Sequence, residues 1–142
     1  MHTSLRALLL ASAVLLCNTA PTSNSPLTVK ILDAVKGTPA VSVALKVFQR
    51  TADGEWTQVA NGVTDVTGEV PNLITEQQFP AGVYRVEFDS KAYWKNKGEV
   101  PFHEVAEVVF NADATGHHHY TLAMLLSPYS YTTTAVEMEA RH

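Results

Sequence analysis

Apolar and polar residues alternate along most of the chain from Leu27 onward, which is the pattern of half-buried β-strands. In the first run, Leu27–Asp33, one face carries Leu27, Val29 and Ile31, and the opposite face carries Thr28, Lys30 and Leu32. The later runs are Val41–Arg50, Glu55–Thr64, a short Glu69–Val70, Gly82–Asp89, Glu104–Ala112, His119–Ser127 and a last one that begins at Tyr131, and Val35–Ala40 is interpreted as a turn. Short strands at this spacing, separated by Gly, Pro, Asn and Asp, predict an all-β, two-sheet sandwich of about eight strands.

One segment, Asp89–Gly98, breaks the alternation and carries the boundary residues of a helix. Asp89 or Ser90 can cap its first turn, lysines occupy its last turn, and Gly98 suits the position after the C-cap. We therefore expect one short α-helix over Ser90–Asn96.

The last strand carries an unusual number of hydroxyl groups. Its two faces hold Tyr131, Thr133 and Ala135 on one side, and Thr132, Thr134 and Val136 on the other. One of these faces can fill a core, as one side of a sheet in a sandwich must. The other face must then meet something that tolerates both methyl and hydroxyl groups, so it is a candidate functional surface.

Residues 1–20 have the three parts of a secretory signal peptide. Arg6 precedes the apolar run Ala7–Leu16, which is too short to span a bilayer, and small residues surround Ala20. We expect cleavage within a few residues of Ala20 and a secreted, extracellular protein.

The remainder is expected to be a flexible arm over residues 21–26 and one β-sandwich domain over residues 27–142. The only cysteine, Cys17, lies in the segment that cleavage removes, so the domain depends on its core and on assembly instead of disulfides. Without Arg6, nine basic residues stand against fourteen acidic ones, a net charge of −5 (9 − 14). That charge argues against nucleic acid and anionic membranes as partners, so we predict neither.

Two histidine patterns are candidate chemistry, and neither meets the geometry that its chemistry needs. HEVAE, His103–Glu107, shares its first half with a zinc-protease motif, but that motif requires a helix and a histidine in place of Glu107. In GHHHY, Gly116–Tyr120, only alternate histidines share a strand face, and no second ligand pair completes a closed metal site. We interpret it as a solvated turn that enters a strand. Without a Gly-x-Ser-x-Gly elbow either, we predict no metal, no cofactor and no catalytic residue.

Lys30 is the most informative charge, because it stands midway along an otherwise apolar strand. As an exposed edge lysine it would discourage aggregation. As the guard of a partly apolar cavity it would pair with an anionic ligand group, with Glu69 as the complementary charge. The pattern alone leaves both interpretations open.

Four segments, PLTVKILDAVKGTPA, YRVEFDSKAYWK, PFHEVAEVVF and YTLAMLLSPYSYTTTAV, follow one another between Pro26 and Val136. Together they resemble the transthyretin family of secreted thyroid-hormone carriers, in particular its fish or other non-mammalian members. The resemblance implies two four-stranded sheets and one short helix in each subunit, assembled as a homotetramer that is a dimer of dimers. Edge strands of two subunits pair, and two dimers face one another across a central channel with two hormone sites.

The resemblance also implies which residues bind the hormones, thyroxine and triiodothyronine, in plasma. Lys30 would contact the hormone carboxylate and Glu69 its amino group. Thr132 and Thr134 would lie at the channel centre, near the phenolic hydroxyl, while Tyr131, Thr133 and Ala135 would pack inward. The histidine cluster of GHHHY would lie away from the channel strands, which bind the ligand. The apolar pockets for the iodines would be formed by Leu32, Ala123, Leu125 and Val136, with Thr121 nearby.

The sequence departs from the family pattern at several positions. Thr132 stands where many members have serine and Thr28 where methionine is common, so we expect the channel to differ in width and lining. Mammalian members present apolar residues at the positions of Lys97 and Glu99 to dock retinol-binding protein. Two charges at these positions argue against that partner here.

Two other classes of function compete with that of a carrier. The hydrolase of 5-hydroxyisourate, which has the same fold, carries two histidines, an arginine and a terminal Tyr-Arg-Gly-Ser; here Lys30, Glu69 and Thr121 occupy the three catalytic positions and the chain ends TTTAVEMEARH. The resemblance therefore predicts a protein that is not an enzyme. An immunoglobulin-like adhesion module would carry a Cys…Trp…Cys arrangement, but the domain has no cysteine.

Overall fold

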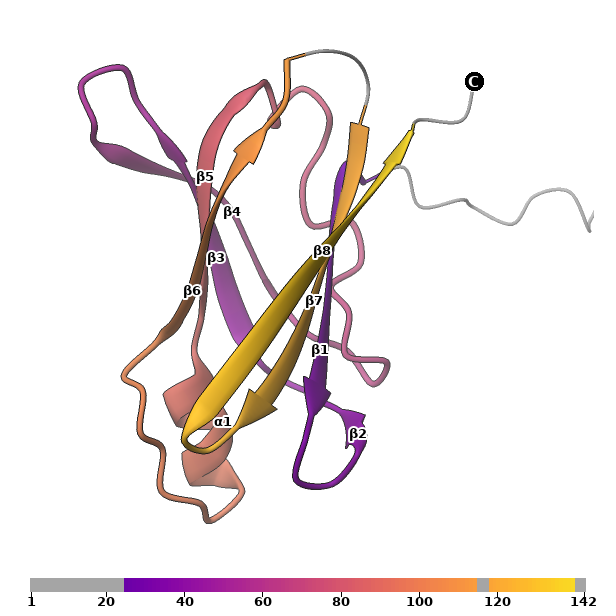
Figure 1. The fold of residues 1–142 in the computed structure, drawn as a ribbon, viewed down its shortest axis with the longest axis vertical. Coiled ribbons are helices and arrows are strands. Elements are labelled where there is room, and N and C mark those ends of the chain that lie inside the picture. Colours follow the sequence, from indigo (N-terminus) through magenta and orange to yellow (C-terminus); the bar gives the residue numbers. More distant parts are fainter. Residues whose placement is uncertain (1–24, 115–117, 140–142) are drawn as a thin grey trace, which may run out of the picture.

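The computed structural model describes residues 25–114 and 118–139, which form eight strands and one helix (Figure 1). The strands are β1 (Leu27–Asp33), β2 (Thr38–Pro39), β3 (Ala44–Arg50), β4 (Trp56–Val63), β5 (Gly82–Phe88), β6 (Ala106–Ala112), β7 (His118–Ser127) and β8 (Ser130–Glu139), and the helix is α1 (Ser90–Asn96). They build two four-stranded sheets, in the orders β2-β1-β7-β8 and β4-β3-β5-β6. The expected all-β sandwich with one short helix is confirmed.

The core lies between the two sheets because each strand turns its apolar positions inward. In β1 the residues Leu27, Val29 and Ile31 are fully buried, and in β5 the same holds for Tyr84 and Val86. These residues belong to one continuous hydrophobic cluster with members from both sheets. The alternation that predicted the strands is therefore also the pattern that closes the sandwich.

Helix α1 forms where its boundary residues predicted it. The carboxylate of Asp89 accepts a hydrogen bond from the backbone N–H of Ala92 at 3.1 Å, which is an N-cap interaction. At the other end Gly98 has a φ of 76°, a left-handed conformation that glycine adopts without strain. The helix buries Tyr93 and Trp94 against the end of the sandwich.

Several strand ends differ from expectation by one or two residues, and three differences are larger. The segment interpreted as a turn contains β2, which pairs with the end of β1. The third strand begins at Ala44 instead of Val41, because Ser42 has a φ of 64° and interrupts the extended chain. The short strand expected at Glu69–Val70 is a single bridge between Glu69 and Lys30.

The expected inward packing of the last strand is correct for one residue of three. Tyr131 is half-buried and its ring lies 5.0 Å from that of His103, but Thr133 and Ala135 are exposed. Strand β8 is the outermost strand of its sheet, and in a single chain its inner side is covered only near Tyr131. The expectation for Thr133 and Ala135 was wrong because strand alternation says nothing about where the opposing sheet ends.

Candidate functional site

The outer face of the sheet β2-β1-β7-β8 gathers the residues that the sequence singled out. Strand β1 pairs in parallel with β7, and β7 pairs antiparallel with β8, so residues that face outward fall into rows across the three strands. The rows are Leu32, Leu125 and Thr132; then Lys30, Ala123 and Thr134; then Thr28, Thr121 and Val136. Glu69 adjoins these rows, because it forms a bridge to Lys30 on β1.

Lys30 and Glu69 form an ion pair at the side of this face. The Nζ of Lys30 lies 3.6 Å from Oε1 of Glu69, and the two side chains are 44% and 42% exposed. Because both charges are hydrated, the pair itself contributes little stability, and each charge remains accessible to a ligand. Lys30 also lies on β1, an interior strand between β2 and β7, so its interpretation as an edge lysine was wrong.

Gly68 determines where Glu69 sits. The carbonyl of Gly68 accepts a hydrogen bond from the N–H of Ile31 at 2.9 Å, and its φ is 80°. A Cβ at this position would lie 2.4 Å from the carbonyl oxygen of Ile31, so only glycine allows the segment to approach β1 so closely. The side chain of Asp65 accepts hydrogen bonds from the N–H groups of Thr67 and Glu69, which holds the turn in place.

The rest of the face is apolar or hydroxylated, with large side chains left uncovered in a single chain. Leu32 is 37% exposed, Leu125 42% and Val136 51%. Thr132 and Thr134 are also exposed, and they place hydroxyl groups beside these methyl groups. A contiguous apolar surface of this kind is typical of a binding site or of an interface with another molecule.

The face continues past the predicted site residues to one more cross-strand pair. His119 pairs with Met138, and both lie on the same side of the sheet as Thr121 and Val136. The expectation that the histidine cluster lies away from the ligand-binding strands was therefore wrong for His119, which belongs to β7. His117 lies outside the described residues. Sequence patterning missed Met138, although its parity with Val136 could have identified it.

The other histidine pattern, HEVAE, places its histidine among aromatic rings. His103 lies in the loop before β6, where its ring contacts those of Phe102 at 4.9 Å and Tyr131 at 5.0 Å. Glu107 lies on β6, and its N–H donates to the Tyr131 hydroxyl at 3.5 Å. The segment is a loop followed by a strand, so it lacks the helix on which a zinc-protease motif depends.

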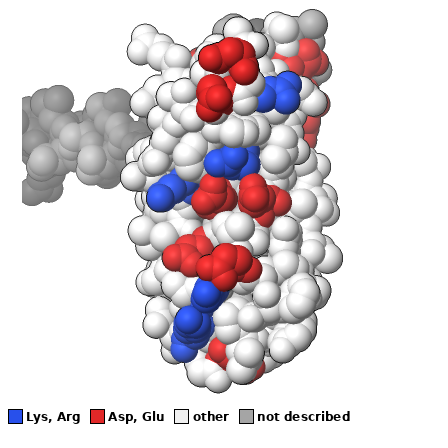
Figure 2. Space-filling model, turned by 90° about the vertical axis from the view of Figure 1, so that its left-hand side faces the viewer, with Lys and Arg blue, Asp and Glu red and all other residues white. Residues whose placement is uncertain are grey.

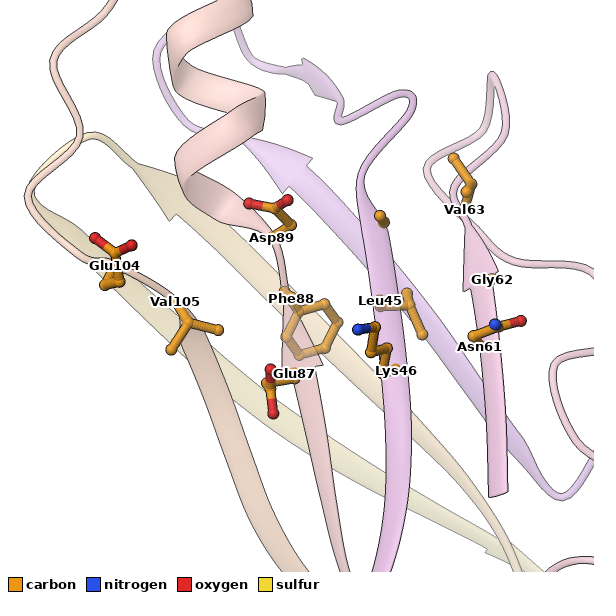
Figure 3. Close-up of a pocket in the computed structure, with 11 residues that line it drawn as sticks. Leu45, Lys46, Asn61, Gly62, Val63, Glu87, Phe88, Asp89, Glu104 and Val105 are labelled. Carbon is orange, nitrogen blue, oxygen red and sulfur yellow. The ribbon is translucent and has the colours of Figure 1, made fainter. Parts of the chain in front are cut away.

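The other sheet carries a pocket of about 440 Å³ on its outer side (Figure 3). Its lining includes three carboxylates, and each already has a partner. Glu87 is 3.1 Å from Arg85, Glu104 is 2.9 Å from Lys91, and Asp89 caps α1. Because its carboxylates are satisfied within the chain, this pocket is a weaker candidate than the open face of the first sheet.

Comparison with known proteins agrees with this geometry. The family model described as "Transthyretin: HIUase/Transthyretin family" matches residues 27–134. The chain belongs to this family. The crystal structure of transthyretin from Sparus aurata is 78% identical, covers 80% of this chain and 98% of its own, and superposes with a TM-score of 0.78. A structure of sea bream transthyretin in complex with thyroxine is 76% identical over 82% of this chain and 99% of its own, also with a TM-score of 0.78. The resemblance to fish members of the family is confirmed.

Within residues 25–114 and 118–139, no helix is both long and apolar enough to cross a bilayer. Lys97 and Glu99, the two charges that argue against docking of retinol-binding protein, lie at and just after the end of α1.

Proposed function

We propose that this protein is an extracellular carrier that binds and transports thyroid hormones, thyroxine and triiodothyronine, in plasma. The observation that carries the proposal is the open face of the sheet β2-β1-β7-β8, where an ion pair adjoins a surface of methyl and hydroxyl groups. The relative that is 76% identical was crystallised with thyroxine, which supports a ligand of this chemistry.

The chemistry of the hormone suggests how it lies on this face. A zwitterionic amino-acid group at one end of the hormone suits a lysine beside a glutamate, so Lys30 is assigned to the carboxylate and Glu69 to the ammonium group. The iodinated rings suit the apolar side chains, and the phenolic hydroxyl suits Thr132 and Thr134. The iodine pockets are assigned to Leu32, Ala123, Leu125 and Val136, with Thr121 beside them.

A second copy of the chain is needed to complete such a site. One sheet face offers only half of the enclosure that a small-molecule site requires, and it leaves Leu32 and Leu125 exposed. We therefore propose a homotetramer built as a dimer of dimers, in which two of these faces enclose a channel. Strands β6 and β8 each lie at the edge of a sheet in the single chain, and pairing between copies would cover those edges.

Hydrolysis of 5-hydroxyisourate is not favoured, although the family includes hydrolases. The positions of the catalytic groups hold Lys30, Glu69 and Thr121, and a lysine–glutamate ion pair stands where acid–base chemistry would need a histidine. His119 is two residues from Thr121 along β7, roughly 7 Å away at the usual rise of a strand, which is beyond hydrogen-bond reach of the same atom.

The proposal is tested on the secreted chain after removal of residues 1–20, a protein of about 122 residues (142 − 20). Competition binding of thyroxine and triiodothyronine is measured together with turnover of 5-hydroxyisourate, and native mass spectrometry gives the number of subunits. Saturable binding of both hormones, four subunits and no turnover are expected. Turnover without hormone binding would overturn the proposal, and a stable monomer at micromolar concentration would overturn the channel.

A further inference from the structure

The face proposed to bind the hormone has an outermost row that carries a titratable group. His119 stands two residues beyond Thr121 on β7, directly across from Met138 on β8. Its side chain is 29% exposed, and that of Met138 is also partly open, at 51% for the residue. Counted along β7 from Ala123, which pairs with Lys30, the imidazole lies about 13 Å from the level of that lysine. A ligand that enters from this end passes His119 before it reaches Lys30.

Glu76 faces His119 from a loop between β4 and β5. Its Oε1 lies 3.6 Å from Nε2 of the imidazole, and its own side chain is 56% exposed. The turn that carries it is held by hydrogen bonds between Thr75 and Gln78 at 3.1–3.3 Å. Buried residues on both sides of the turn, Ile74 and Phe79, fix the loop to the core, so the carboxylate has a defined position near the sheet.

The imidazole nitrogen that faces Glu76 is buried and has no hydrogen-bond partner. A buried polar atom without a partner is costly, and at this distance a small approach of the two side chains would remove the cost if the nitrogen carried a proton. Histidine is the side chain whose charge changes between pH 5 and pH 8. The pair is thus arranged so that protonation converts a neutral ring beside a carboxylate into an ion pair.

We propose that His119 and Glu76 together select ligands by charge at the outer end of the proposed hormone site. With a neutral imidazole the pair carries a net charge of −1 and opposes an anionic ligand. With a protonated imidazole the net charge is zero, so anionic ligands bind more tightly and cationic ligands more weakly than before. The inference rests on the proposed function, because it concerns the entrance of the same site.

Among the described residues, Glu76 is the charged group that faces the imidazole. Strand β8 contributes the uncharged Met138 opposite it, and the neighbouring Glu137 pairs with Tyr120 on the other side of the sheet. Strand β1 begins with Leu27, which pairs with Tyr120 and brings no charge to this row. Over some 10 Å, with a Debye length of about 8 Å at physiological salt, one unit of charge should change affinity about two- to fourfold.

The test compares two forms of the hormone that differ in charge and share their rings. One is the deaminated hormone, which keeps only the carboxylate, and the other is the decarboxylated hormone, which keeps only the ammonium group. Affinities are measured at pH 6 and pH 8 for the wild type, His119→Gln and Glu76→Gln, with His103→Gln as the matched histidine control. Because the ligand has the same ionisation state with every variant at one pH, its own titration cancels when variants are compared at that pH.

At pH 6 the wild type should bind the deaminated hormone about two- to fourfold more tightly than His119→Gln, and the decarboxylated hormone more weakly. At pH 8 these two proteins should bind each ligand equally. Glu76→Gln should bind the deaminated hormone about two- to fourfold more tightly than the wild type at pH 8. These differences should shrink at high salt, and His103→Gln should behave as the wild type throughout.

Binding of both ligands with no difference between wild type and His119→Gln at pH 6 would overturn the inference and leave the proposed function intact. The same holds if both ligands shift in the same direction, since a packing effect would not depend on ligand charge. If none of the proteins binds either ligand, the proposed function fails, and the inference fails with it.

Discussion

The outer faces of the two sheets are built on the same alternation but carry opposite kinds of residue. On the sheet β4-β3-β5-β6, the guanidinium of Arg85 lies 4.5 Å from the ring of Phe48 and 4.8 Å from that of Trp56, with ion pairs to Glu87 and Glu107 at 3.1 and 3.6 Å. Figure 2 shows charges of both signs gathered in a stripe along this side of the molecule. On the sheet β2-β1-β7-β8, the rows of outward residues contain one charge, on Lys30.

The two faces differ in whether their side chains have partners within the chain. Each charge around Arg85 has an opposite charge or an aromatic ring beside it, so these charges are satisfied within the chain. The other face exposes leucine and valine beside hydroxyl groups and gives them no partner within the described chain. Alternation specifies that a strand has an outer face, and the residues on that face then decide whether it meets solvent or a ligand.

The largest expected effect comes from filling the outer face of the sheet β2-β1-β7-β8, where the hormone is proposed to bind. Thr132→Tyr should lower the affinity for both hormones more than hundredfold, or about 2.7 kcal/mol, because the ring would occupy the channel centre. Lys46→Tyr, which puts the same ring on the charged face, should leave affinity within about twofold. Native mass spectrometry checks that both variants keep their assembly. Wild-type affinity in Thr132→Tyr would mean that the hormone does not reach the centre of this face.

A change that touches neither outer face should affect stability alone. The hydroxyl of Tyr93 on α1 donates to the buried carboxylate of Asp33 at 2.5 Å, so Tyr93→Phe should lower the free energy of unfolding by about 1.5–3 kcal/mol. Urea unfolding at fixed protein concentration measures this loss. Hormone affinity of the folded variant should stay unchanged, and a large loss of affinity would show that the two regions are coupled.

The stability lost in Tyr93→Phe should depend on pH. Burial alone would raise the pKa of Asp33, but hydrogen bonds from Tyr93 and from the N–H groups of Lys36 and Val35 outweigh it and hold the pKa below 3.8. A carboxyl whose folded-state pKa is depressed stabilises the fold above its ordinary pKa, and that stability is lost as the pH falls through the folded value. The stability difference between the wild type and Tyr93→Phe should therefore be largest near neutral pH and shrink below pH 3.8.

The next prediction concerns Lys30, the charge at the side of the proposed hormone-binding face. Lys30→Ala should weaken binding of the intact hormone about five- to thirtyfold, or about 1–2 kcal/mol, and weaken the decarboxylated hormone much less. Four affinities, two proteins with two ligands, give the coupling energy between the lysine and the carboxylate. A coupling energy of zero would mean that Lys30 does not meet the carboxylate, and the assigned orientation of the hormone would be wrong.

The smallest effect is expected on the charged face. Arg85→Met keeps an apolar stem over the two rings and removes the charge, so the free energy of unfolding should fall by only about 1 kcal/mol. Hormone affinity should be unaffected. Thermal unfolding and hormone binding, measured on the same sample, check both statements. A loss of affinity above about threefold would contradict the assignment of this face to solvent.

Much of this organisation could be predicted from the sequence, for reasons that are local. The run Leu27–Asp33 and the cap residues around α1 act over a few residues, so both elements appear at the expected positions. The site residues could be assigned because the resemblance spans the whole domain and strand parity then puts Thr132 and Val136 on one face.

What could not be predicted depends on contacts between distant residues. Exposure of Thr133 depends on where the opposing sheet ends, and the strand beginning at Ala44 depends on the left-handed conformation of Ser42. The pairing of His119 with Glu76 joins β7 to a loop some forty residues earlier, and no local pattern announces it.

The parallel pairing of β1 with β7 has a consequence for the order in which the molecule forms. Leu27 pairs with Tyr120, 93 residues later (120 − 27), whereas the sheet β4-β3-β5-β6 uses only strands between Ala44 and Ala112 and joins them antiparallel. A ribosome releases the chain from its N-terminus, so the charged sheet can assemble while β7 and β8 are still being made. Strand β1 waits through that interval with one side unpaired, and long-range parallel pairing is intrinsically slow. The surface proposed to carry the hormone is therefore completed last, and a chain interrupted before residue 120 would have β1 without the strands β7 and β8 that complete this surface.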